Sequence, residues 1–172
     1  QLAQATLRQI RLFATDVDGV LTDAGMYYSE SGDEWKKFNT RDSAGVLFLN
    51  HLGILLVVLT GEDTQIMKNR AAKLKLEHVF HGVKNKVEVA EKFCQDRGIE
   101  LSEAAFIGDD LLDLKLLQRV GFSACPQDAA EYTKKVVNHV TSSRGGEGAF
   151  RDFVEEILRR ADCHQKVIDQ WL

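Results

Sequence analysis

The stretch that decides the fold of this chain is Leu12-Phe13-Ala14-Thr15-Asp16-Val17-Asp18-Gly19-Val20-Leu21-Thr22-Asp23. The apolar run from Ile10 to Ala14 predicts a buried strand, and Gly19 permits a sharp turn after it. Carboxylates at the end of a buried strand are costly to desolvate, and two of them repel unless a cation lies between them. In an extended segment, residues i and i+2 point the same way. Asp16 and Asp18 therefore indicate a cation site that holds a nucleophile, although a calcium loop or a capped turn fits the same residues.

The composition of the chain is that of one globular domain. The 172 residues are 44% hydrophobic and 28% charged, with a formal net charge of -4, and this acidic balance disfavours non-specific nucleic-acid binding. No apolar run approaches the roughly 20 residues of a membrane span, and the first residues lack a signal-peptide core. Three widely spaced cysteines fit no disulfide or zinc pattern, namely Cys94, Cys125 and Cys163. We therefore expect a single domain over residues 1–172, in a reducing cytoplasm, without nucleic-acid or membrane partners.

Strand-like and helix-like segments alternate along the chain. Strands are expected over residues 10–14, 54–59, 78–80, 104–107 and 122–124 and near residue 140, and helices over 44–51, 64–74, 86–97, 111–120, 129–136 and 149–161, before a C-terminal tail over about 162–172. Thr40 or Asp42 is a natural cap of the first helix. The alternation predicts a doubly wound α/β fold with a mainly parallel sheet, in which ligands bind beyond the carboxyl ends of the strands. Asp16, Thr60 and Asp109 follow strands and would face one crevice.

Aromatic residues flank a Ser/Gly turn shortly after the first strand. Tyr27 and Tyr28 precede the turn Ser29-Glu30-Ser31-Gly32, and Trp35 and Phe38 follow it, a pattern that predicts a β-hairpin over about residues 24–38. A two-stranded ribbon cannot bury four large rings by itself. The rings therefore pack either on their own domain or on another subunit, and the pattern leaves both alternatives open.

Further polar positions follow strands or begin helices. Thr60 can donate its hydroxyl to a phosphoryl oxygen or cap the next helix. Lys86 begins a helix, where a cation and the helix N-terminus form a phosphate site, although a solvated lysine is the common alternative. Asp109 and Asp113 are four residues apart and are expected on one helix face. There they can ligate a cation and hold the lysine, or simply favour the helix N-terminus.

These positions, in this order, resemble the four motifs of the haloacid dehalogenase (HAD) superfamily of phosphohydrolases. The motifs are Asp16-Val17-Asp18-Gly19-Val20, Thr60 after a strand, Lys86 on a helix and Gly108-Asp109-Asp110-x-x-Asp113. The resemblance implies a HAD Rossmann-like phosphatase in which Asp16 is the nucleophile and Asp18 is the general acid and then the general base. It also implies a Mg²⁺ ion held by Asp16, the Asp18 main-chain carbonyl and Asp109, a phosphate bound by Thr60, Gly61 and Lys86, and a supporting role for Asp113.

The segments between the motifs leave little room for a cap domain. A hairpin and one helix separate Asp18 from Thr60, and one helix and a short strand separate Thr60 from Lys86. The chain thus resembles the capless phosphatases of 2-keto-3-deoxy sugar-acid phosphates, and this resemblance implies a homotetramer assembled through the hairpin. The stretch from Arg144 to Arg151 is similar to the C-terminal signature of the group that hydrolyses 3-deoxy-D-manno-octulosonate 8-phosphate (KDO 8-phosphate).

Glu62 departs from that group, which usually has Arg after the Thr-Gly step. Together with Thr40, Arg70 and Lys73, Glu62 resembles a sister group that hydrolyses the sialic-acid-like 2-keto-3-deoxynononate 9-phosphate (KDN 9-phosphate). The resemblance implies that Thr40, Glu62 and Lys73 contact the sugar and that Arg70 of a neighbouring subunit pairs with its carboxylate. Alternatively, Glu62, Arg70 and Lys73 form a solvated helix face. We expect a KDN 9-phosphate phosphatase, with a KDO 8-phosphate phosphatase and a non-catalytic tetramerisation module as alternatives.

Overall fold

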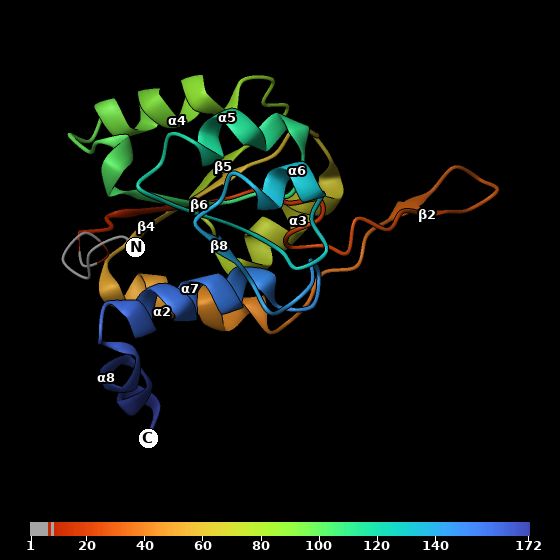
Figure 1. The fold of residues 1–172 in the computed structure, drawn as a ribbon. Helices are drawn as coiled ribbons and strands as arrows, with labels where there is room; N and C mark the ends of the chain where they lie inside the picture. The colour runs from red at the N-terminus through yellow and green to blue at the C-terminus, as the bar shows by residue number, and fades with distance from the viewer. Residues whose placement is uncertain (1–6, 8) are drawn as a thin grey trace.

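A six-stranded parallel sheet lies at the centre of the fold (Figure 1). The structure is a computed structural model and describes residue 7 and residues 9–172. In spatial order the strands are β5 (His78–Phe80), β4 (Leu55–Leu59), β1 (Leu12–Thr15), β6 (Ala104–Ile107), β7 (Phe122–Cys125) and β8 (His139–Val140). Every neighbouring pair is parallel. The expected doubly wound α/β fold is therefore confirmed.

Strand β1 lies at the middle of the sheet, between β4 and β6. All four of its residues are buried, which fits an apolar strand covered on both faces. From β1 the chain builds β4 and β5 on one side, and it then returns to build β6, β7 and β8 on the other. The strand order reverses here, so the carboxyl ends of β1 and β6 flank the crevice where doubly wound sheets bind their ligands.

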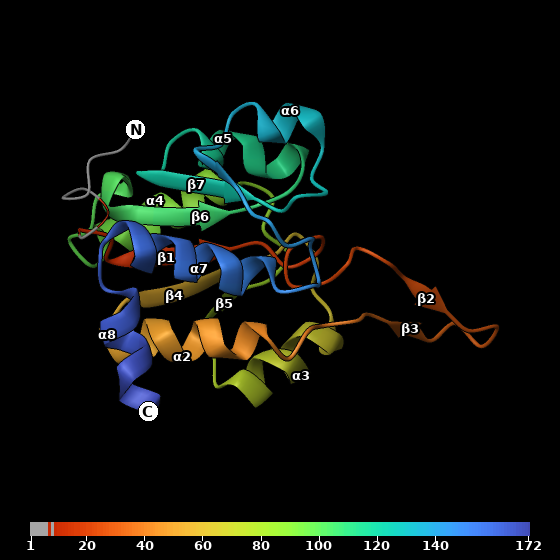
Figure 2. The same cartoon turned by 60° about the horizontal axis from the view of Figure 1, so that its bottom comes forward.

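Helices cover both faces of this sheet (Figure 2). The helices α2 (Asp42–Leu52), α3 (Gln65–Leu74) and α7 (Ala149–Arg160) share one apolar core with β1, and α4 (Lys86–Gln95) and α5 (Leu114–Leu117) share the other. Phe13 anchors the first core, with its ring centroid 5.2 Å from those of Phe150 and Phe153. This burial of apolar area on both sides fixes the strand ends in space.

The C-terminal tail is more ordered than the sequence predicts. It contains α8 (His164–Ile168) and a 3₁₀ turn, η3 (Asp169–Trp171). The Trp171 ring lies edge-on to Phe48 and His51 of α2, with centroids 5.5 Å and 5.7 Å away. The tail therefore packs against the helical layer. Among the described residues, no helix is long and apolar enough to cross a membrane.

The predicted hairpin is present and projects from the body as an arm (Figures 1 and 2). Its strands β2 (Tyr27–Tyr28) and β3 (Glu34–Trp35) pair antiparallel and form a separate two-stranded sheet. Tyr27, Tyr28 and Trp35 are 54%, 66% and 60% exposed. The fourth ring, Phe38, instead packs against the main core and is half-buried. Three of the four aromatic rings therefore find no cover within the described part of this chain.

Two helices are shorter than the sequence predicts by more than two residues. Residues 111–120 form a 3₁₀ turn, η2 (Leu111–Asp113), followed by the single-turn helix α5, because the Asp113 side chain occupies backbone amides at the start of the segment. Residues 129–136 contain only α6 (Glu131–Lys134), since Ala130 has an extended ψ of 145° and delays the helix start. A further 3₁₀ turn, η1 (Leu101–Glu103), precedes β6.

The start of α2 also corrects the expected cap. Arg41 lies at the N-cap position, in a helical conformation and without a side-chain cap, and Asp42 is the first helical residue. Asp42 is 2% exposed, and its Oδ1 accepts the Arg151 amide of α7 at 3.2 Å, whereas its Oδ2 is buried without a partner. Burial raises the pKa of Asp42 to about 6. The hydrogen bond from the Arg151 amide and the charges of Arg70 and Arg151 lower this pKa, but they do not outweigh burial. Asp42 thus joins α2 to α7 instead of capping α2.

We predict that Asp42→Asn changes how stability depends on pH. A carboxyl whose pKa rises from 3.8 to about 6 on folding stabilises the fold when protonated, and this contribution is lost as pH rises from about 4 through 6. The neutral amide does not titrate. Between pH 4 and pH 7.5 the free energy of unfolding of the parent should fall by about 2–3 kcal/mol relative to the variant. Urea titrations at both pH values measure this, and a constant difference between the two proteins would contradict it.

Candidate active site

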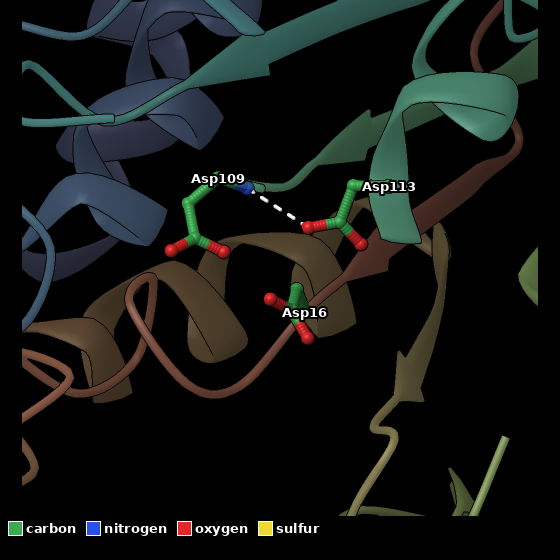
Figure 3. Close-up of side chains that lie close together, drawn as sticks. All are labelled: Asp16, Asp109 and Asp113. Atoms are coloured by element: carbon green, nitrogen blue, oxygen red, sulfur yellow. Dashed lines mark hydrogen bonds between the residues drawn. The ribbon is translucent and has the colours of Figure 1, made fainter. Parts of the chain in front are cut away.

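The predicted acidic residues meet at the carboxyl ends of β1 and β6 (Figure 3). Asp16 follows β1 directly, and Asp109 follows β6 after one glycine. One carboxylate oxygen from each of Asp16, Asp109 and Asp113 lies within 4.8 Å of the other two. Asp16 and Asp113 are 8% and 1% exposed, while Asp109 is partly exposed. The structure thus brings Asp16, at the end of β1, together with two acids that follow β6.

Asp113 holds the loop that carries Asp109. Its Oδ2 accepts the backbone amides of Asp109 at 2.9 Å and Asp110 at 3.3 Å. Asp109 therefore precedes the helical turn, and the expectation that Asp109 and Asp113 share a helix face is wrong. Because Oδ1 of Asp113 is also occupied, by the ammonium of Lys86 at 2.6 Å, Asp113 supports its neighbours and has little capacity left for a cation.

Lys86 bridges Asp113 and Asp16. It is the first residue of α4, whose N-terminus is capped by the Asn85 side chain at 3.3 Å from the Glu88 amide. Its Nζ donates to Asp16 Oδ1 at 2.7 Å as well as to Asp113, and the residue is only 4% exposed. Burial opposes the charged form, yet the charges of Asp16 and Asp113 outweigh burial and raise the pKa of Lys86. A permanent cation therefore lies beside Asp16.

The acidic cluster carries more negative charge than Lys86 offsets. Burial, and next the charge of Asp113, raises the pKa of Asp16 to about 6. Burial, and next the hydrogen bond and the charge of Asp16, raises the pKa of Asp109 to about 9. Carboxylates that resist ionisation in this way form a favourable site for a divalent cation. An all-oxygen donor set suits Mg²⁺, so Asp16 and Asp109 fit the predicted metal.

Gly19 leaves room for Asp109. Its φ of +86° lies in the left-handed region, which confirms the predicted sharp turn. A Cβ at this position would lie 1.9 Å from Asp109 Oδ2, so any side chain here would displace the carboxylate. Two constraints therefore favour glycine at this position: the left-handed backbone conformation and the close approach of the Asp109 carboxylate.

The Arg144–Arg151 stretch supports the same loop from the other side. The Gly146 amide donates to the Val20 carbonyl at 3.0 Å. A Cβ at Gly145 would lie 1.9 Å from the Gly19 carbonyl oxygen, so the two backbones are in direct contact. The side-chain amide of Asn39 reaches the Gly146 carbonyl at 3.0 Å. Through these contacts, the glycine-rich stretch packs against the backbone of the first motif and supports it.

The predicted phosphate-binding residues of the next motif lie at the end of the neighbouring strand. Thr60 directly follows β4 and is 1% exposed, and its Oγ1 accepts the Glu62 amide at 3.3 Å. The hydroxyl proton stays available for a ligand oxygen. Gly61 is exposed, and a Cβ there would lie 3.8 Å from Cδ1 of Leu112, which follows Asp109 by three residues. Thr60 and Gly61 thus line the same edge of the sheet as the acids.

Lys36 is a residue of this site that the sequence reasoning missed. Its Nζ donates to Asp18 Oδ1 at 2.7 Å and also bonds Glu62. Its side chain is only 3% exposed, although it directly follows the exposed strand β3. Burial disfavours the ammonium, but the hydrogen bonds and charges of Asp18 and Glu62 outweigh it and raise the pKa of Lys36. No periodicity distinguishes Lys36 from the adjacent exposed Lys37.

The remaining predicted substrate residues are Arg70, Lys73 and Thr40. Arg70 donates to the Asn39 carbonyl at 3.2 Å, and its guanidinium lies 5.5 Å from the centroid of the Phe38 ring. Lys73 is exposed on α3, and Thr40 is exposed just before α2. Arg70 thus contacts the base of the arm. The substrate roles of Arg70, Lys73 and Thr40 stay predictions.

Comparison with known proteins decides the family. The model of the haloacid dehalogenase-like hydrolases matches residues 70–151. The KDO 8-phosphate phosphatase of Haemophilus influenzae is 37% identical over 156 residues, which cover 91% of this chain and 87% of that protein. The chain belongs to the haloacid dehalogenase-like hydrolase family. The predicted superfamily and the predicted hydrolase class are confirmed.

Solved structures of HAD hydrolases share the fold. The KDO 8-phosphate phosphatase of Moraxella catarrhalis, in complex with magnesium, phosphate and KDO, is 34% identical, has a TM-score of 0.92 and covers 98% of this chain and 97% of that one. The cobalt-bound deoxy-D-mannose-octulosonate 8-phosphate phosphatase of H. influenzae is 36% identical, has a TM-score of 0.86 and covers 92% and 93%. Both solved structures are thus of phosphatases, one with bound magnesium and one with bound cobalt.

We predict that Gly19→Ala abolishes most activity and that Gly32→Ala does not. Both glycines have a left-handed φ, of +86° and +91°, but a Cβ at Gly32 meets nothing within 4 Å. The two variants therefore carry a similar backbone cost, and only Gly19→Ala pushes Asp109 aside. We expect kcat/KM for a phosphate ester to fall at least about tenfold in Gly19→Ala alone. Equal losses in both variants would show that backbone strain, not the position of Asp109, explains the glycine.

Proposed function

We propose that this HAD hydrolase is a Mg²⁺-dependent phosphatase of KDO 8-phosphate that acts through an aspartyl-phosphate. The observation that carries the proposal is the buried Asp16 carboxylate at the carboxyl end of the central strand, with the ammonium of Lys86 2.7 Å away. A carboxylate so placed is a nucleophile with a fixed direction. The neighbouring cation lies where an anionic phosphoryl group would otherwise be repelled.

In the first step, one oxygen of Asp16 attacks phosphorus and the bond from phosphorus to the sugar oxygen breaks. Asp18 gives its proton to that departing oxygen, because an alkoxide is a poor leaving group. Thr60, the Gly61 amide and Lys86 donate to the phosphoryl oxygens. Asp113 keeps Lys86 in place through the bond of 2.6 Å. The burial of Asp16 and Lys86 strengthens these interactions by excluding water.

In the second step, Asp18 removes a proton from a water molecule. The water oxygen attacks phosphorus, the bond from phosphorus to Asp16 breaks, and inorganic phosphate leaves with Asp18 protonated again. Asp18 is the group suited to this exchange because its side chain is 33% exposed, whereas Asp16 is buried. One carboxyl thus serves as acid and as base in turn.

Mg²⁺ would be held by the carboxylates of Asp16 and Asp109 and by the main-chain carbonyl of Asp18. When bound, the ion offsets the repulsion between the Asp16 carboxylate and the phosphoryl oxygens. The raised pKa values of Asp16 and Asp109 support this set of ligands, because a divalent cation stabilises both ionised forms. The magnesium in the M. catarrhalis relative supports the choice of ion.

The substrate proposal follows the relatives and not the expectation from Glu62. The relatives named above are KDO 8-phosphate phosphatases and are 34–37% identical to this chain. They do not support the KDN 9-phosphate specificity that the sequence suggested. Within this chain, Glu62 is paired with Lys36, so a contact with Lys36 explains the carboxylate without a nine-carbon sugar. We therefore choose the eight-carbon substrate.

The arm supports a second part of the proposal, a homotetramer. Tyr27, Tyr28 and Trp35 are more than half exposed on a two-stranded ribbon that cannot bury them. Exposed aromatic patches of this kind are typical of protein interfaces. Packing of the arms on other copies would cover the rings and help close each site.

Sedimentation velocity tests the proposed homotetramer, and a monomer at micromolar concentration would contradict it.

We predict that Mg²⁺-dependent phosphate release favours KDO 8-phosphate over KDN 9-phosphate in kcat/KM. We also predict that Asp16→Asn lowers the rate at least about a thousandfold, because the attacking oxygen is lost. Asp96→Asn is the matched control, since Asp96 lies in an exposed pair with Lys92 on α4. A preference for the nine-carbon ester would overturn the substrate, and an Asp16→Asn enzyme at the parent's rate would overturn the phosphatase mechanism.

A further inference from the structure

The arm contributes one buried charge to the site, the ammonium of Lys36. Neighbouring residues of the arm are exposed, including Trp35 at 60%, whereas the Lys36 side chain is 3% exposed. Its Nζ donates to Asp18 Oδ1 at 2.7 Å and pairs with Glu62 as well. Lys36 thus ties three segments together: the loop after β1, the base of the arm and the loop after β4.

A lysine buried to this extent is unusual for its residue type. Removing an ammonium from water is costly, and the cost is offset only where carboxylates and hydrogen bonds compensate for it. A mere anchor for the arm could be apolar, as Phe38 is two residues later. The burial of a charge at this position therefore calls for a role that needs the charge.

The two carboxylates that meet Lys36 are not equivalent. Asp18 is the proposed acid and base, and its side chain is 33% exposed. Glu62 is 51% exposed at the rim. Because Glu62 shares the single ammonium, Lys36 can fix the direction of the Asp18 carboxyl without neutralising it completely. One oxygen of Asp18 is held, and the other is left for the proton that moves.

We propose that Lys36 is a positioning residue that aims Asp18 at the leaving-group oxygen, and that Glu62 acts through Lys36. This inference rests on the phosphatase mechanism proposed above. In it the proton passes from Asp18 to the departing oxygen, and Lys36 exchanges no proton. Loss of Lys36 then affects the step in which the leaving group needs a proton more than any other step.

The test compares two esters in single turnovers with enzyme in excess and saturating Mg²⁺, so that only release of the leaving group is measured. KDO 8-phosphate leaves as an alkoxide that needs the proton, while p-nitrophenyl phosphate leaves as a stable phenolate that does not. For Lys36→Met we expect release from KDO 8-phosphate to fall at least about tenfold, and release from p-nitrophenyl phosphate to fall less than about threefold.

Lys36→Arg and Lys37→Met are the companion variants. Arginine keeps the charge and should restore most of the rate on KDO 8-phosphate, and Lys37, the exposed neighbour, should be neutral on both esters. Should Lys36→Met fail to fold, Glu62→Gln on the exposed rim provides the same comparison. We expect it to slow KDO 8-phosphate a few-fold and to spare the aryl ester.

Equal losses on the two esters, or no loss on either, would overturn the positioning role of Lys36. That result differs from a failure of the proposed function. If the parent enzyme releases phosphate from neither ester, the phosphatase proposal itself fails, whatever the variants do.

Discussion

The structure depends on one ammonium that lies between two carboxylates in the interior. Lys86 Nζ is 2.7 Å from Asp16 and 2.6 Å from Asp113, and all three residues are less than 10% exposed. This contact joins the end of β1, the start of α4 and the turn after β6. Buried ion pairs contribute little net stability because desolvation offsets their attraction. In the proposed mechanism, this arrangement instead binds a phosphoryl group.

Close backbone packing around this contact restricts which residues the neighbouring loops can contain. Gly19 meets Asp109, and Gly145 meets the Gly19 carbonyl from behind. The acidic loop is thus held between a carboxylate on one side and the glycine-rich stretch from Arg144 to Gly148 on the other. Asp113 adds two bonds to backbone amides. Asp16 and Asp109, the proposed nucleophile and metal ligand, are therefore held by both backbone and side-chain contacts.

The sequence predicts well those features that depend on local patterns. The bounds of β5 and β6 agree with expectation because each is a short run between clear breaks. Asp16, Thr60 and Asp109 lie at strand ends on one edge because parallel strands share their direction. The roles of these residues were predicted from the family resemblance, because composition and periodicity do not indicate them.

The features that the sequence did not predict depend on contacts between distant segments. Asp42 is a plausible cap by residue type, but the approach of α7 buries it against the Arg151 amide. One exception is local: the Asp113 side chain accepts the Asp109 and Asp110 amides, and the helix after Asp110 is interrupted there. Lys36 differs from the exposed Lys37 because it contacts Asp18 and Glu62, which belong to other segments. Such choices follow from tertiary packing, which overrides local preference.

The most direct measurement is to trap the phosphoryl group on Asp16. An Asp18→Asn enzyme lacks the base for the second step, so with Mg²⁺ and p-nitrophenyl phosphate it should accumulate the aspartyl-phosphate. Acid quenching and peptide mass mapping should then find one phosphoryl group on the peptide that contains Asp16, and none in the Asp16→Asn, Asp18→Asn double variant. A phosphoryl group on another residue, or none while p-nitrophenol is released in stoichiometric amount, would contradict the account.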